Sequence, residues 1–282
     1  MPKIAANRCH ERILRFFHKN HLIIVLAIIF VVGCSVVWLL LKNLDRKNYK
    51  EVFISVYDVQ KNYKKAKDTI INTGSFLEYS LLGVPPIKVD KSVEVFKSYN
   101  ESVERLEKLN ISHDQDISNQ YNMFINKNEK FKIYINNLSK SIDSINNISK
   151  ECKKSNSVLD AEMNPDKIAP SYADMTPSCI GAWNNLQNSK IQSLSRLASS
   201  VSKLMLNNRK NLDELQDAST KGRQAKILSI VEEIRKNNRE MVIVAGRFSE
   251  DIKEELRAID LEDDLKNLND FAAKRIRILT VD

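Results

Sequence analysis

The stretch ISNQYNMFINKNEKFKIYINNLSKSIDSINNISKEC, residues 117–152, decides the fold class, because one set of its positions recurs at alternating spacings of four and three residues. Those positions are Ile117, Tyr121, Phe124, Asn128, Phe131, Ile135, Leu138, Ile142, Ile145, Ser149 and Cys152. Mostly apolar residues at this spacing line one face of an α-helix and form a coiled-coil-like seam. The pattern predicts a single helix of about forty residues, roughly 60 Å long.

Two later segments repeat this pattern. Their seam residues are Ile180, Trp183, Leu194, Leu197, Val201, Leu204, Leu212 and Leu215 in the first, and Val231, Ile234, Asn238, Met241, Ala245, Phe248, Ile252, Leu256 and Ile259 in the second. Short connections between long helices favour antiparallel neighbours. We therefore predict an all-α fold, in which a single N-terminal transmembrane helix precedes an elongated antiparallel helical bundle with heptad seams.

The shortage of turn residues supports this fold class. The 282 residues include only 6 glycines and 6 prolines, which leaves few places for turns and argues against a strand-rich domain. We expect breaks between helices near residues 83–89, 110–114, 163–178, 220–222 and 259–261. The predicted regions are a basic juxtamembrane tail (1–21), a transmembrane helix (22–41) and an extracytoplasmic helical bundle (42–282).

The apolar run LIIVLAIIFVVGCSVVWLLL extends from Leu22 to Leu41 without a charged residue. As a helix it spans about 30 Å, the thickness of the hydrocarbon core of a bilayer. Trp38 lies near one end of the run, where interfacial aromatic residues gather. The run predicts a membrane anchor.

Cys34 within this run allows two interpretations. The residues Val31-Val32-Gly33-Cys34 resemble a bacterial lipobox, in which the cysteine is lipidated after cleavage. However, a cleavage site lies at the end of a short apolar region, and here six of the seven residues after Cys34 are apolar. We therefore interpret Cys34 as an apolar residue of an uncleaved signal anchor, and a lipoprotein is the alternative.

Orientation in the membrane is decided by the basic tail. Five basic residues precede the span, Lys3, Arg8, Arg12, Arg15 and Lys19, and five follow it within the window that counts, so the charges on the two sides balance. Since a short basic tail is harder to translocate than a long domain, we expect a cytoplasmic N-terminus. The opposite orientation would make the protein a cytoplasmic-facing tether. The expected location is the cell (inner or plasma) membrane.

The sequence contains no pattern that predicts catalysis or cofactor binding. There is no GxSxG, Walker, CxxC or HExxH motif, and the acidic residues lie beside Lys or Arg on expected solvated helix faces. The net charge of +8 arises from 44 basic and 36 acidic residues that are interspersed, which argues against nucleic-acid binding. We expect no enzyme activity, no cofactor and no metal.

We therefore expect a non-enzymatic structural or adaptor protein of the cell envelope. Its partners would be the lipid bilayer and other envelope or membrane proteins, possible homo-oligomers among them, bound through helix faces. The alternative is a sensor or ligand-binding ectodomain that works with another membrane protein. The layout resembles the ectodomain of bacterial chemoreceptors, although no second hydrophobic span follows the bundle.

Cys152 and Cys179 bracket the proline-rich segment 164–178. In an antiparallel hairpin the helix ends that carry them would lie close together. In an exported domain the two cysteines would form a disulfide, and the alternative is two separate buried thiols.

Asparagines occupy seam positions on three predicted helices. If the two cysteines mark one hairpin tip, Asn128, Asn208 and Asn238 fall at nearly the same level along the bundle. We hypothesise a buried polar layer that fixes the register of the helices. The alternatives are a small-ligand site and a set of asparagines that reach water at the seam edge.

Overall fold

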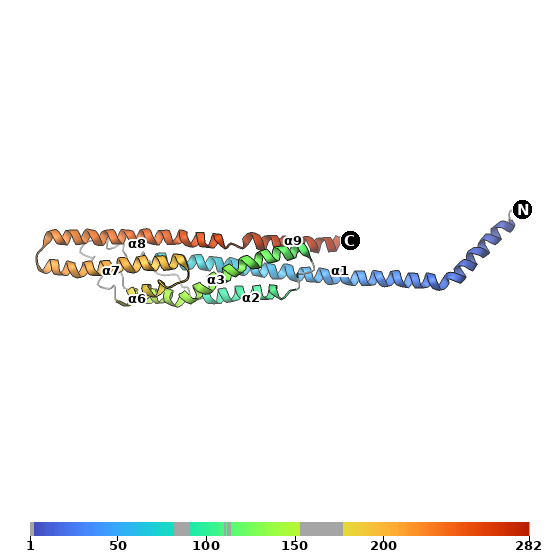
Figure 1. The fold of residues 1–282 in the computed structure, drawn as a ribbon, viewed down its shortest axis with the longest axis horizontal. Helices are drawn as coiled ribbons and strands as arrows, with labels where there is room; N and C mark the ends of the chain where they lie inside the picture. Colours follow the sequence, from blue (N-terminus) through green and yellow to red (C-terminus); the bar gives the residue numbers. More distant parts are fainter. Residues whose placement is uncertain (1–2, 82–90, 110, 112–113, 153–176, 282) are drawn as a thin grey trace. The chain divides into compact units, whose positions relative to one another are not determined.

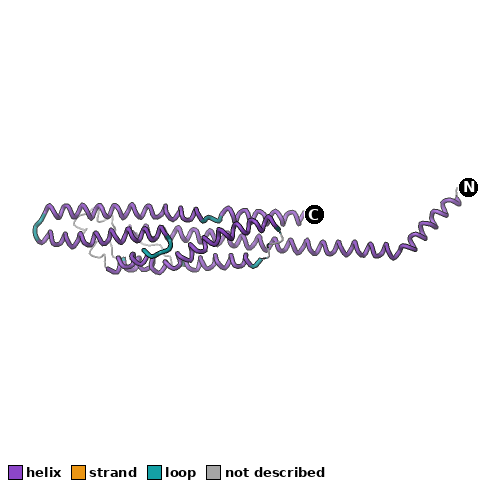
Figure 2. The backbone as a smooth tube through the Cα atoms, in the orientation of Figure 1, coloured by secondary structure: helices purple, strands orange, loops and turns teal. Residues whose placement is uncertain are grey.

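The computed structural model describes residues 3–81, 91–109, 111, 114–152 and 177–281, and Figure 1 shows its fold. All regular structure in these ranges is helical, as Figure 2 shows by colour, and no strand occurs among the described residues. The expectation of an all-α helical bundle is confirmed.

Seven helices make up the described part of the chain. They are α1 (Lys3–Leu81), α2 (Ser92–Glu107), α3 (Gln115–Glu151), α6 (Pro177–Leu186), α7 (Gln192–Thr220), α8 (Gln224–Ala258) and α9 (Glu262–Val281).

The chain divides into two compact units. Residues 1–53 and 271–282 form one unit, and residues 54–270 form the other. The second unit holds most of the buried core and is called the bundle below. Helix α1 contributes to both units, since it runs from Lys3 to Leu81 as one helix.

Helices α7 and α8 form an antiparallel hairpin and lie side by side (Figure 1). Contacts near the open end join Ser193 to Glu255, and contacts near the turn join Glu214 to Lys226. The turn contains Gly222 with φ of 64°, a left-handed conformation that glycine adopts without a Cβ penalty.

The seam of α3 lies in the core. Phe124, Phe131 and Ile135 are completely buried, as the four-three spacing predicts. The helix starts at a side-chain cap, because Asp114 Oδ1 accepts hydrogen bonds from the backbone N–H of Asp116 and Ile117.

The predicted helix from Ile180 to Leu215 is wrong as a single element, because the chain leaves the helix between Leu186 and Gln192. Helix α6 packs against both α3 and α7, and α7 then starts a new direction along α8. The break is held locally: Ser195 Oγ donates to the Gln187 carbonyl at 2.5 Å, and the Ile191 N–H donates to Ser189 Oγ at 3.2 Å. The segment QNSKI thus ends a helix without glycine or proline.

Helices α1 and α8 approach closely at Gly74. A Cβ atom at this position would lie only 2.9 Å from Cδ1 of Ile252. Gly74 is buried, so the absence of a side chain allows this contact.

The other expected breaks fall as follows. Helix α2 ends at Glu107 and α3 begins at Gln115, α7 and α8 are separated at residues 221–223, and α8 and α9 at residues 259–261. The break at 83–89 lies outside the described residues, as does that at 163–178 up to residue 176.

Candidate functional site

The best-defined polar site in the bundle is a group of four side chains, Tyr63, Lys67, Asp260 and Glu262, called the Asp260 network here. Tyr63 and Lys67 lie on α1, and Asp260 lies in the break between α8 and α9. The two elements are almost 200 residues apart in the sequence, so only the tertiary fold brings them together.

Asp260 is the centre of this network. Its Oδ1 accepts a hydrogen bond from the Tyr63 hydroxyl at 2.8 Å and from the backbone N–H of Glu262 at 3.0 Å. Its Oδ2 lies 2.6 Å from Nζ of Lys67, which also lies 3.4 Å from Oε2 of Glu262. Asp260 therefore caps the start of α9 and binds α1 at the same time.

Tyr63 makes a second contact to the break. The backbone N–H of Leu261 donates to the Tyr63 hydroxyl at 3.1 Å, so this hydroxyl both donates and accepts. Without it, the buried Leu261 N–H would lose a hydrogen bond, which is costly in the interior.

These contacts determine the titration behaviour of the network. Burial raises the pKa of Tyr63, and the hydrogen bond to Asp260 raises it further. Burial alone would raise the pKa of Asp260, but the hydrogen bonds from Lys67 and Tyr63 outweigh it and lower that pKa. Burial alone would lower the pKa of Lys67, yet its hydrogen bond and charge attraction to Asp260 raise it. At neutral pH the network is thus an ion pair with a neutral phenol beside it.

An aromatic cluster lies behind Tyr63. The ring centroids of Tyr63 and Phe131 are 4.9 Å apart, and those of Tyr99 and Phe131 are 5.1 Å apart, both with edge-to-face geometry. These three rings come from α1, α3 and α2 and are buried. Tyr99 donates a hydrogen bond to Oδ1 of the buried Asn128. The cluster packs three helices together beside the break between α8 and α9.

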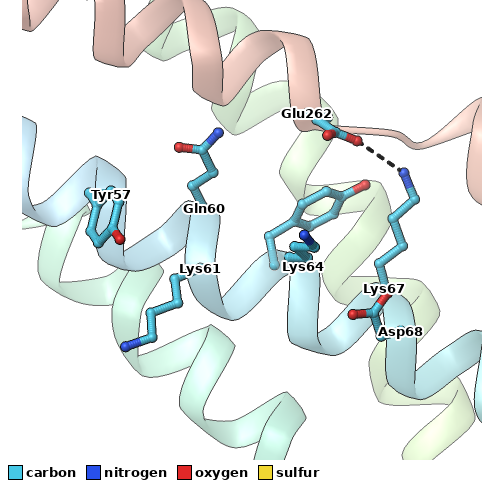
Figure 3. Close-up of a pocket in the computed structure, with 8 residues that line it drawn as sticks. Tyr57, Gln60, Lys61, Lys64, Lys67, Asp68 and Glu262 are labelled. Atoms are coloured by element: carbon cyan, nitrogen blue, oxygen red, sulfur yellow. Dashed lines mark hydrogen bonds and ion pairs between the residues drawn. The ribbon is translucent and has the colours of Figure 1, made fainter.

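An open groove of about 460 Å³ adjoins the network on α1 (Figure 3). Its lining residues are Tyr57, Gln60, Lys61, Tyr63, Lys64, Lys67, Asp68 and Glu262. Charged side chains of both signs line it, and Figure 3 shows Lys67 directed toward Glu262 while Lys61 points away from it. The groove is therefore an open surface depression with charged side chains at its edge and not an enclosed cavity.

The anchor residues predicted from the sequence all lie on α1. From Val25 to Leu41 the large apolar side chains are exposed, among them Trp38, whose ring lies 5.1 Å from Nζ of Lys42. Cys34 is a free, exposed cysteine. The helix contains one segment long and apolar enough to cross a membrane. The side chains of Leu22 and of the basic residues Arg8, Arg12, Arg15 and Lys19 lie outside the described residues.

Cys152 and Cys179 are joined by a disulfide with a Cα–Cα distance of 5.0 Å. The bond links the end of α3 to the first turns of α6. A hydrogen bond farther back along α3 joins Ser141 Oγ to Ser189 Oγ, in the segment that follows α6, at 3.2 Å. Helix α6 is thus held against the last third of α3.

The structure brings Asn208 and Asn238 together. Asn208 Nδ2 donates to Asn238 Oδ1 at 3.0 Å, and Asn208 Oδ1 accepts from Asn237 Nδ2 at 2.8 Å. All three side chains are buried. The amide layer therefore belongs to the hairpin of α7 and α8.

Asn128 is not part of this layer, so the expectation of one layer across three helices is wrong. The Tyr134 hydroxyl of α3 donates a hydrogen bond to Glu255 of α8, so these two residues lie at the same level along the bundle. Asn238 lies 17 residues from Glu255 along α8, and Asn128 lies 6 residues from Tyr134 in the opposite direction, toward the Lys127–Asp264 ion pair. These separations add to 23 residues, or about 35 Å at 1.5 Å per residue. The cause is the break after Leu186, which sends α7 away from Asn128.

The sequence pattern did not identify Tyr63, Lys67 and Asp260 as a group. One available signal was the motif IDLED at residues 259–263, in which Asp260 precedes a new helix as a capping residue does. Nothing in the sequence connects that cap to α1. The groups of His, Cys, Asp and Glu needed for a metal site do not occur in the part of the chain that the structure describes.

Comparison with known proteins adds no relatives: no family model, no curated protein and no solved structure matches this chain.

Proposed function

We propose that this protein is a non-enzymatic, membrane-anchored adaptor of the cell envelope that binds other proteins through the outer faces of its helices. The proposal places residues 22–41 in the cell membrane, the N-terminus in the cytoplasm and residues 42–282 outside it. The disulfide between Cys152 and Cys179 supports the outward orientation, since disulfides persist in oxidising compartments.

The observation that carries the adaptor role is the exposure of large apolar side chains on the α7–α8 hairpin. Leu206 is 51% exposed, Ile243 is 45% exposed and Leu228 is 66% exposed, although the same helices also bury a face of mostly apolar residues. Exposed apolar side chains on outer helix faces suit protein contacts. A ligand-binding domain would instead present an enclosed pocket, and the groove beside Tyr63 is open to solvent.

Site-specific photo-crosslinking in cells tests this proposal. A photoreactive residue at Leu206 or Ile243 should form adducts with a distinct protein, because a partner would cover these side chains. Lys253 of α8 is also exposed, lies 10 residues from Ile243 along the helix and serves as the control position, where we expect few adducts.

Two results would contradict the adaptor role. One is the absence of protein adducts at Leu206, Ile243 and Leu228 alike. The other is co-purification of a stoichiometric small molecule with a monomeric protein, which would favour the sensor alternative.

A further inference from the structure

The break between α8 and α9 contains one local stabilising contact, the hydrogen bond from the Glu262 N–H to Asp260 Oδ1 at 3.0 Å, but no residue that forbids a helix. The sequence Arg257-Ala258-Ile259-Asp260-Leu261 contains neither glycine nor proline, so nothing in its covalent structure prevents a continuous helix. The backbone bonds at the end of α8 are turn-like, from the Ile259 N–H to the Leu256 carbonyl at 3.2 Å and from the Asp260 N–H to the Arg257 carbonyl at 3.4 Å.

The break reorients the buried face of the chain. Helix α8 buries Phe248, Ile252 and Leu256, whereas the next buried apolar residue, Leu261, follows after five positions. At about 100° per residue, five positions rotate a straight helix by about 140° beyond one full turn. A continuous helix would therefore turn Leu261, and with it Leu265 and Leu268, away from the core.

Two arrangements of this segment are thus compatible with the sequence. In the observed one the break aligns both apolar faces with the core, and Leu261, Leu265 and Leu268 are completely buried. In the other a straight helix satisfies the backbone of residues 259–262 but exposes the apolar face of α9. Packed elements with two discrete arrangements are the usual basis of conformational switches.

The contacts that distinguish these arrangements come from α1. The Tyr63 hydroxyl accepts from the Leu261 N–H, and Lys67 binds Asp260 at 2.6 Å. A continuous helix would use the Leu261 N–H for an internal hydrogen bond and would reorient the Asp260 side chain. Both contacts with α1 therefore belong to the bent arrangement alone.

We propose that Tyr63 and Lys67 act as a latch by which α1 controls whether the apolar face of α9 is packed in the core or released. Helix α1 is also the helix that contains the apolar segment Val25–Leu41. The two contacts with α1 exist in the bent arrangement and not in the straight one, so they shift the equilibrium toward the bent arrangement. It does not depend on the adaptor role proposed above.

Hydrogen exchange with mass spectrometry on the full-length protein in lipid nanodiscs tests the latch. Tyr63→Phe removes the hydroxyl and keeps the ring, and Lys67→Met removes the charge and keeps the length. We expect each variant to accelerate exchange of the residue 262–270 peptide at least tenfold, because a helix released from the core loses the packing that protects it.

Tyr134→Phe is the matched control. Tyr134 is a partly buried tyrosine of the bundle that donates to a carboxylate of α8, Glu255 at 3.2 Å, but it does not contact the break. Its effect on the 262–270 peptide should stay below threefold.

Two results would overturn the latch. One is unchanged exchange of residues 262–270 in both Tyr63→Phe and Lys67→Met. The other is equal acceleration in Tyr134→Phe, which would show general loosening of the bundle. Circular dichroism identifies a variant that fails to fold. If Tyr63→Phe fails to fold, the exchange measured for Lys67→Met, at a partly exposed position, tests the latch alone.

Discussion

At the scale of single residues, the polar side chains inside the bundle are the least expected feature. Asn208 is completely buried and uses its oxygen for Asn237 and its nitrogen for Asn238. A buried amide with matched partners costs little, whereas loss of one partner leaves the others without compensation. Such a layer favours one register of the two helices over shifted pairings.

Replacing Asn208 by Ala should therefore destabilise the protein by about 1–3 kcal/mol, since Asn237 and Asn238 both lose a hydrogen bond. Urea denaturation followed by circular dichroism measures the change. The double variant Asn208→Leu with Asn238→Leu should recover part of the loss. If the single variant is as stable as the wild type, the amide layer has no structural role.

The Asp260 carboxylate makes a prediction about acid stability. Its pKa is lowered in the folded state, so its contribution to stability is complete above the unfolded pKa of about 4 and disappears as the pH falls through the lower folded value. The groups that face it are Lys67 and Tyr63 of α1 and Glu262 of α9. Lys67 remains charged throughout this range because its own pKa is raised.

The variant Asp260→Asn should consequently be less stable than the wild type at pH 7. Because it lacks this carboxylate, it should lose less stability than the wild type as the pH falls below about 5. Urea midpoints measured at several pH values for both proteins provide the test. Parallel pH profiles for variant and wild type would rule out Asp260 as a source of the acid dependence.

At the scale of elements, the sequence predicts helices better than their ends. The seam of α3 is regular over its whole length, and the helix follows it. The break after Leu186 was missed because QNSKI lacks glycine and proline. A signal was nevertheless present, since the four-three spacing from Trp183 places the polar residues Gln187 and Lys190 in the seam. The Asp260 network could not be predicted, because it depends on which faces of α1 and α8 meet.

The disulfide between the ends of α3 and α6 should stabilise the protein by about 3 kcal/mol, because it closes a loop between residues 27 positions apart. The variant Cys152→Ser with Cys179→Ser should lose this amount in urea denaturation. Addition of a reductant should lower the wild type to the same level and leave the variant unchanged. Equal stability of oxidised and reduced wild-type protein would contradict the prediction.

The contact of α1 with α8 at Gly74 can be tested in the same way. Gly74→Ala should destabilise the bundle by at most about 1 kcal/mol, because its Cβ would lie 2.9 Å from Cδ1 of Ile252, the movable end of that side chain, and alanine is the better helix former. Shortening the partner in the double variant Gly74→Ala with Ile252→Val should remove the conflict and restore part of the stability. A stabilised Gly74→Ala protein would show that α8 shifts freely and that the approach is not tight.

At the scale of the whole molecule, one helix contains both the apolar segment and part of the bundle core. Helix α1 carries the exposed residues Val25–Leu41 and also the buried residues Val56, Val59 and Tyr63. In the proposed function, the apolar segment of this helix crosses the membrane. The proposed function therefore depends on the side of the membrane on which residues 42–282 lie.

Labelling of intact cells with a membrane-impermeant maleimide tests this placement most directly. A single reactive cysteine is introduced as Lys236→Cys at an exposed position of α8, in a background with Cys9→Ser and Cys34→Ser and with the Cys152–Cys179 disulfide retained. We predict that membrane-bound protein is labelled before the cells are lysed. Labelling only after lysis, or protein that is recovered outside the membrane fraction, would contradict the account.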